Sequence, residues 1–138
     1  MLRTIPAAVM ISFAAISPAW AAASVSGTWL TTEKDSVVEI GPCGNALCGR
    51  VARILKPGPN GPPRDSNNPD ARLRGRAILG LPILTGFRDT GQSWEGTAYD
   101  PRAGKSYRSY LTLKPDGTLE VKGCVGPFCR KKIWTPAR

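Results

Sequence analysis

Polar and apolar residues alternate along much of the chain with the period of two that is typical of β-strands. In residues 107–113 every odd position carries Tyr, Ser or Leu, and these side chains would share one face of a strand. Residues 94–100 alternate in the same way, and turn-forming residues follow at 100–104 and 115–117. We therefore predict strands at residues 27–32, 36–40, 47–54, 94–100, 107–113, 118–123 and 129–135. Short strands separated by turns predict an all-β sandwich or barrel.

The middle of the chain, residues 56–86, breaks this pattern. It begins with a proline-rich stretch at residues 57–63, and Asn68-Pro69-Asp70 then resembles a helix start, with Asn68 as the cap. The helix can reach only about Arg74, because Gly75 follows. The apolar run from Leu79 to Phe87 comes next. A loop of this length is usually functional or covers part of the fold, so we expect the run to cover or line one end of the domain.

The N-terminal segment resembles a secretion signal. Arg3 provides a positive charge, residues 5–16 are mostly apolar, and Ala19-Trp20-Ala21 has small residues where a signal peptidase reads them. We expect cleavage after Ala21, or alternatively after Ala23. The apolar run is too short to span a bilayer. The sequence thus predicts a signal peptide at residues 1–21 and one domain at residues 22–138, in a protein of the periplasm or the extracellular medium that is not an integral membrane protein.

Four cysteines form two C-x4-C loops, Cys43–Cys48 and Cys124–Cys129. An exported protein meets an oxidising compartment, which favours disulfides over a zinc site. Pairing within each loop fits the turn residues that surround the cysteines, whereas pairing across the chain would close much longer loops. We expect the local pairing, with no metal and no cofactor.

Charge and composition restrict the function classes. The formal net charge is +9, and removal of Arg3 with the leader leaves about +8. A basic exported protein is attracted to anionic envelope polymers and acidic lipids, while export argues against nucleic acid as the partner. The chain has no histidine, which excludes a Ser-His-Asp triad and histidine-ligated metal. No pair of carboxylates stands out by its spacing, so we expect a protein that is not an enzyme.

Several motifs together resemble a bacterial secreted family, domain-of-unknown-function family 2147. The similarity covers essentially the whole chain after the leader. The motifs are Gly27-x-Trp29, Val38-x-Ile40-x-Pro42-Cys43-Gly44, Cys48-Gly49-Arg50-Val51, Asn68-Pro69-Asp70, Leu73-Arg74-Gly75-Arg76-x-x-Leu79-Gly80-Leu81-x-Ile83-Leu84, Tyr99-Asp100-Pro101-x-x-Gly104-Lys105-x-Tyr107, Gly123-Cys124-Val125-Gly126 and Trp134.

The resemblance implies a lipocalin-like or calycin-like fold, a small antiparallel meander barrel with one long central loop. It also implies that Trp29 closes one end of the barrel, where a basic residue such as Lys132 or Arg138 would cover it. The family resemblance implies no activity, substrate or cofactor. Large aromatic residues dominate protein cores, so core packing is the simplest role for Trp29 and Trp134.

Three functions fit these observations to different degrees. The leading one is binding of a small hydrophobic or acidic molecule, with Asn68, Arg74, Arg76 and Tyr107 as the candidate site, because arginines form charge-assisted bonds to acidic groups. The alternative is a packed barrel that contacts the envelope through its basic surface and has no internal ligand. An enzyme is the weakest of the three.

Overall fold

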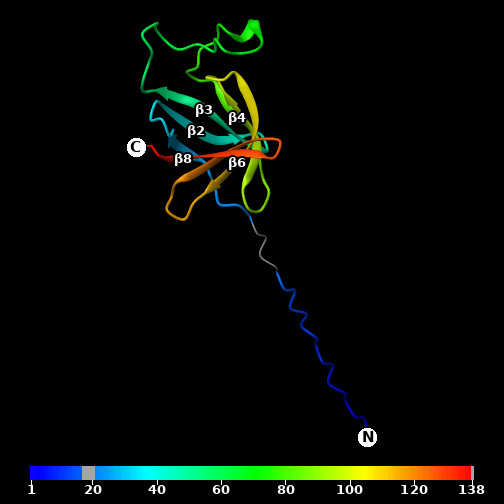
Figure 1. The fold of residues 1–138 in the computed structure, drawn as a ribbon. Helices are drawn as coiled ribbons and strands as arrows, with labels where there is room; N and C mark the ends of the chain where they lie inside the picture. The colour runs from blue at the N-terminus through cyan, green and yellow to red at the C-terminus, as the bar shows by residue number, and fades with distance from the viewer. Residues whose placement is uncertain (17–20, 138) are drawn as a thin grey trace.

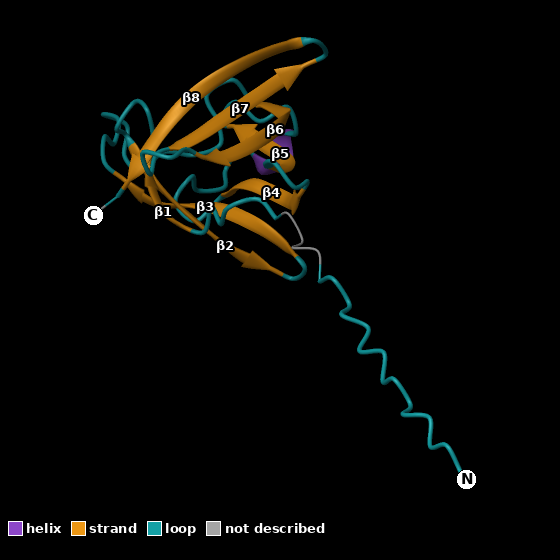
Figure 2. Cartoon of the chain, turned by 90° about the horizontal axis from the view of Figure 1, so that it is seen from below, coloured by secondary structure: helices purple, strands orange, loops and turns teal. Residues whose placement is uncertain are grey.

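The computed structural model describes residues 1–16 and 21–137. Its antiparallel strands follow one another in chain order and close into a barrel in which β8 also pairs with β1 (Figures 1 and 2). The predicted all-β meander barrel is therefore confirmed. The strands are β1 (Gly27–Leu30), β2 (Ser36–Cys43), β3 (Ala46–Ile54), β4 (Pro82–Asp89), β5 (Trp94–Asp100), β6 (Lys105–Leu113), β7 (Leu119–Val125) and β8 (Phe128–Pro136).

Residues 1–16 extend away from the barrel and have no regular secondary structure (Figure 1). The residues Ala19 and Trp20 of the predicted cleavage motif lie outside the described residues. No helix within residues 1–16 and 21–137 is long and apolar enough to cross a bilayer.

The meander places alternate connections at opposite ends of the barrel. The end that carries the loops 31–35, 55–81, 101–104 and 126–127 is called the mouth. The other end carries the connections β2–β3, β4–β5 and β6–β7 and is called the closed end. The central loop, residues 55–81, forms a green lobe beyond the mouth (Figure 1).

Apolar side chains fill the barrel toward its closed end. The expected packing of Trp29 and Trp134 in the core is confirmed, since both are buried there, and the Trp29 Nε1 donates to the backbone oxygen of Val25 at 3.0 Å. Lys132 pairs with Glu33, and Arg138, the other basic residue expected to cover Trp29, lies outside the described residues. The core cluster comprises Val25, Trp29, Val38, Ile40, Leu47, Leu84, Phe87, Leu111, Leu119 and Trp134.

The prediction that Leu79 to Phe87 covers or lines one end of the domain is wrong for most of that segment. Residues 82–89 form β4, a wall strand that the sequence pattern did not reveal, and Leu84 and Phe87 point into the core. Glycines on the neighbouring strands make room for them. A Cβ on Gly49 would lie 2.8 Å from Leu84, and one on Gly96 would lie 2.7 Å from the Phe87 ring. A short apolar run does not distinguish a buried strand from a cover by periodicity alone.

The helix expected in the central loop is a single 3-10 turn, η1 (Ala71–Leu73). Its cap is Asp70 rather than the predicted Asn68, because Asp70 Oδ1 accepts from the Arg72 nitrogen at 3.0 Å. The Asn68 side chain accepts from the Asp70 nitrogen at 2.8 Å and so shapes the turn that precedes the helix.

The local disulfide pairing is confirmed. Cys43–Cys48 closes the β2–β3 hairpin at the closed end, and Cys124–Cys129 closes the β7–β8 hairpin at the mouth. Each bridge joins the two strands of one hairpin next to its turn. The bridges therefore brace hairpin tips and do not tie distant parts of the chain together.

The central loop packs closely on the β5–β6 turn. Asn67 Nδ2 donates to the backbone oxygen of Arg102 at 2.8 Å. A Cβ on Gly104 would lie 1.8 Å from the backbone oxygen of Asn67. Gly104 has φ +63°, a conformation that favours glycine. Glycine at this position thus lets the loop approach the barrel.

We predict that Gly104→Ala is more destabilising than Gly117→Ala. Gly117 also has a positive φ, but an added Cβ there would meet nothing within 4 Å. Gly117→Ala should cost about 1–2 kcal/mol from backbone strain alone. Gly104→Ala should cost about 1–3 kcal/mol more, because the methyl group collides with the loop. Urea unfolding of the oxidised proteins measures both values, and equal costs would contradict the close packing of the loop.

Candidate functional site

A buried carboxylate anchors the central loop to the barrel wall. Asp65 is fully buried and accepts three side-chain hydrogen bonds, from Tyr99 Oη at 2.5 Å, Asn68 Nδ2 at 2.8 Å and Arg76 Nε at 2.8 Å. Its backbone nitrogen also donates to the Arg76 oxygen at 2.9 Å. Tyr99 belongs to β5, so these bonds join two parts of the loop to the wall.

The same contacts set the ionisation of the carboxylate and the phenol. Burial raises the pKa of Asp65, but the hydrogen bonds from Tyr99, Asn68 and Arg76 outweigh it and hold that pKa below its usual value. Burial, followed by the hydrogen bond to Asp65, raises the pKa of Tyr99. At neutral pH Asp65 is therefore charged and Tyr99 is a neutral donor.

Three of the four predicted site residues meet in this cluster. Asn68 and Arg76 contact Asp65 directly, and Arg74 Nε donates to the backbone oxygen of Asn68 at 2.8 Å. Arg74 thus holds the backbone of the loop, while Asn68 and Arg76 also line an open pocket. Asp65 is not among the residues predicted for the site, because nothing local in the sequence links it to Arg76, eleven residues further on.

The pocket lies between the central loop and the outer surface of the barrel wall. Its volume is about 460 Å³. In β5, Trp94 and Ala98 pack against the core, so the alternate residues Thr97 and Tyr99 point outward. The lining residues are Asn68, Pro69 and Arg76 from the loop, Pro82, Ile83 and Thr85 from β4, Thr97 and Tyr99 from β5, and Gly104 and Ser106 near the start of β6.

The chemistry of the pocket suits a small molecule that is partly apolar and partly anionic. Arg76 bonds to Asp65 only through Nε, so within the described residues its two terminal nitrogens donate to no protein group. The Arg76 side chain is 38% exposed, and its guanidinium also lies 5.8 Å from the centre of the Tyr99 ring. Hydroxyls of Thr85, Thr97 and Ser106 lie in the same lining, opposite apolar surface from Ile83.

Tyr107, the fourth predicted residue, lies on the other side of the wall. It pairs with Ala98, whose side chain packs against the core, so Tyr107 faces the barrel interior. There it lies beside Gly123, where a Cβ would be 3.8 Å from the Tyr107 Cβ. Ser109, also on the inner face, is fully buried, and its hydroxyl has no partner in the described residues. Tyr107 is therefore not part of the pocket under the loop.

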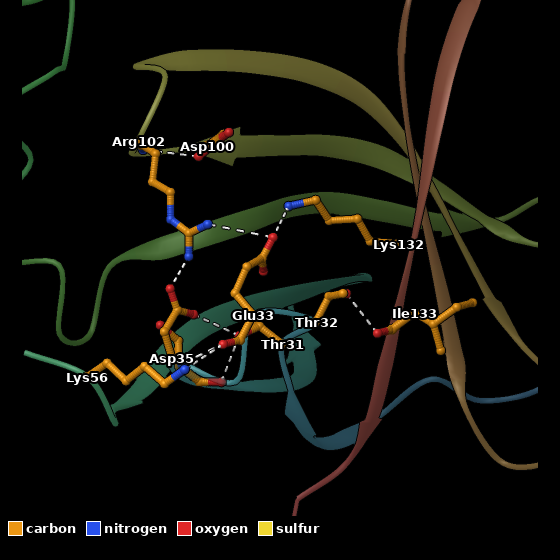
Figure 3. Close-up of polar contacts among 10 residues, drawn as sticks. Thr31, Thr32, Glu33, Asp35, Lys56, Asp100, Arg102, Lys132 and Ile133 are labelled. Carbon is orange, nitrogen blue, oxygen red and sulfur yellow. Dashed lines mark hydrogen bonds and ion pairs between the residues drawn. The ribbon is translucent and has the colours of Figure 1, made fainter.

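A second polar cluster bridges the mouth (Figure 3). Arg102, from the β5–β6 turn, pairs with Asp35 and lies 3.6 Å from Glu33, both in the β1–β2 turn. Lys132 of β8 pairs with Glu33 as well, and Lys56 Nζ donates to the Glu33 backbone oxygen at 3.2 Å. Burial raises the pKa of Glu33, but its hydrogen bond to Lys132 and the nearby charges bring it below its usual value. This cluster connects the mouth loops across the barrel end.

We predict that Asp65 makes stability depend on pH in the acid range. Because its folded pKa lies below the unfolded value of about 3.9, its contribution is complete above pH of about 5 and is lost as the pH falls through the folded pKa. Asp65→Asn should lower the unfolding free energy at pH 7 by about 3–5 kcal/mol, since it leaves Arg76 without its partner. Chemical denaturation at pH 7 and pH 3 should show a smaller loss on acidification in the variant. Equal losses in both proteins would contradict this assignment.

Comparisons with known proteins agree with the fold and leave the activity open. A solved structure described as HP1028 of Helicobacter pylori, a protein of the lipocalin family, is similar with a TM-score of 0.73 and 22% identity over 83% of this chain and 84% of that one. At this identity the likeness shows the fold alone. No curated protein matches the sequence. The model of the family DUF2147, uncharacterised proteins conserved in bacteria, matches residues 27–136. The chain therefore belongs to the DUF2147 family.

Proposed function

We propose that this protein is exported to the periplasm and binds a small acidic molecule in the pocket between the central loop and the outer wall formed by β4, β5 and β6. The observation that carries the proposal is Arg76. Its Nε is held by the buried Asp65 carboxylate, while its terminal nitrogens lie at the pocket and bond to none of the residues that the structure describes. A guanidinium fixed in this way presents two parallel donors, which suits a carboxylate or phosphate group.

The surroundings of Arg76 support the same ligand class. The positively charged chain raises the local concentration of anions. The hydroxyls of Thr97 and Ser106 can donate to further oxygens, and Ile83 with Pro82 offers surface for a short apolar portion. A site of about 460 Å³ falls within the range of small-molecule pockets. Lipocalin-like barrels are typically binding proteins, which accords with a binding role rather than catalysis.

Asn68 lines the pocket and donates to Asp65, whereas Arg74 supports the site indirectly in this proposal. Arg74 bonds the backbone oxygens of Asn68 and Pro69, and thereby holds the loop in the shape that forms the pocket. Tyr107 has no role in it, because it faces the barrel interior.

We predict that filling the pocket abolishes anion binding without unfolding the protein. Thr97→Phe places a large side chain in the pocket, whereas Thr135→Phe changes an exposed strand threonine outside it. Arg76→Lys keeps the charge beside Asp65 but removes the planar pair of donors. Titration with inorganic phosphate and with hexanoate, followed by ¹H–¹⁵N NMR, should shift resonances of Thr97 and Ser106 in the wild-type protein.

In Thr97→Phe these shifts should disappear, and in Arg76→Lys the dissociation constant should rise about tenfold, as for loss of one charge-assisted bond. Thr135→Phe should bind as the wild type does. Shifts that persist unchanged in Thr97→Phe, or that never occur at the pocket residues, would reject the proposed site.

A second function is favoured by the β7–β8 hairpin, the projecting pair of strands in Figure 2. The pairing of β6 with β7 ends at Arg108 and Cys124, so the tip, residues 125–128, extends beyond it. There Val125 is 62% exposed and Phe128 is 80% exposed. Arg108 and Arg130 lie just behind the tip and form no ion pair with the described residues. An exposed aromatic tip with basic residues behind it suits an anionic membrane or envelope surface.

We predict that Phe128→Ser weakens binding to phosphatidylglycerol vesicles at least about tenfold, because a buried phenylalanine is worth about 1.5–3 kcal/mol. Arg130→Gln should weaken binding about fivefold, from the loss of about 1 kcal/mol of attraction. Leu79→Ser is the matched control, since Leu79 is also an exposed apolar residue but belongs to the central loop. Sedimentation with vesicles measures the affinity. Equal effects of Phe128→Ser and Leu79→Ser would contradict a role for the tip.

A further inference from the structure

Asp89, the last residue of β4, lies at the closed end of the barrel and binds the start of the folded domain. Its carboxylate accepts from the backbone nitrogen of Ala22 with both oxygens, at 3.0 Å and 3.1 Å. The Oδ1 atom also accepts from the Gly91 nitrogen at 2.7 Å. The Ala22 nitrogen thus lies between the two oxygens of the carboxylate, a position that would also suit a cationic nitrogen.

No lysine or arginine among the described residues forms an ion pair with Asp89. This is notable in a chain with 19 basic and 10 acidic residues. Its neighbour Arg88 is directed to Asn45, with 3.4 Å between Nη2 and Oδ1. In the part of the chain that the structure describes, the Asp89 carboxylate is therefore held by backbone donors alone.

The residues that follow Ala22 are fixed on the closed end by two indoles. Trp94 Nε1 donates to the backbone oxygen of Ala23 at 2.9 Å, and Trp29 Nε1 donates to that of Val25 at 3.0 Å. The Val25 side chain is fully buried in the core cluster. The folded domain thus begins at Ala22, whereas residues 1–16 extend away from it (Figure 1).

We propose that the leader is removed after Ala21 and that Asp89 is the binding site for the new α-ammonium group of Ala22. Water hydrolyses the peptide bond between Ala21 and Ala22, which leaves a carboxylate on Ala21 and an ammonium group on Ala22. The nitrogen already lies between the two oxygens of Asp89, so cleavage turns a neutral N–H contact into an ion pair. This inference rests on the predicted signal peptide and is independent of the ligand pocket.

The contacts separate the two cleavage positions that the sequence leaves open. Cleavage after Ala21 keeps every contact of the segment and adds a charge to one of them. Cleavage after Ala23 would remove the Ala22 nitrogen that donates to Asp89 and the Ala23 oxygen that accepts from Trp94 Nε1. The structure therefore favours the first position.

The direct test is the intact mass of the protein recovered from the periplasm of a bacterial host that expresses the whole chain. The expected mass is that of residues 22–138 with two disulfides. A mass that corresponds to residues 24–138, or to the uncleaved chain, would overturn the proposal.

A stability experiment tests the ion pair itself. Asp89→Asn should raise the unfolding equilibrium constant of the mature protein about threefold, as expected for the loss of an exposed ion pair. The matched control is Asp116→Asn, because Asp116 Oδ1 also accepts from the nitrogen two residues later but has no contact with the N-terminus. After deletion of Ala22 and Ala23, Asp89→Asn should raise the unfolding equilibrium constant no more than Asp116→Asn does. Moreover, 1 M NaCl should shrink the effect of Asp89→Asn in the mature protein. An Asp89→Asn effect that survives the deletion would overturn the ion pair, even if the cleavage position is correct.

Discussion

The carboxylate of Asp65 is the constraint on which the candidate site depends. A charge that is fully buried is costly unless donors surround it, and Asp65 has three, from Tyr99, Asn68 and Arg76. These bonds attach the central loop to the outer wall of the barrel and fix Arg76 at the edge of a pocket. The loop contributes few residues to the apolar core, so its position depends on polar contacts and on the space that Gly104 leaves for Asn67.

Basic side chains serve different purposes in different parts of the chain. Within the described residues the pairing of β8 with β1 begins at Thr135, so β1 does not cover the edge of β8 before that residue. There Thr32 Oγ1 donates to the Ile133 oxygen at 2.8 Å, and Lys132 reaches Glu33 across the mouth (Figure 3). Charged residues on a free strand edge discourage pairing with other chains. The basic residues Arg130, Lys131 and Lys132 of β8 thus discourage pairing at this strand edge and also place charge behind the tip of the β7–β8 hairpin.

The fold could largely be predicted from the sequence, because its strongest signals are local. Alternation in 94–100 and 107–113 predicted wall strands, and turn residues around each cysteine pair predicted hairpin disulfides. β4 was missed because its apolar residues do not alternate regularly, and its place depends on the distant glycines Gly49 and Gly96. The site was predicted in part. Asn68, Arg74 and Arg76 lie close together in the sequence of the central loop, but the link from Asp65 to Tyr99 spans 34 residues and leaves no periodic signal.

The central claim is that the protein carries a small acidic molecule in the pocket beside Arg76. The most direct measurement is native mass spectrometry of the non-reduced protein purified from the bacterium that makes it. The account predicts an added mass that dissociates as an acidic small molecule and that is absent from the Thr97→Phe variant purified in the same way. A wild-type protein that carries no added mass, or a bound molecule that Thr97→Phe retains, would contradict it.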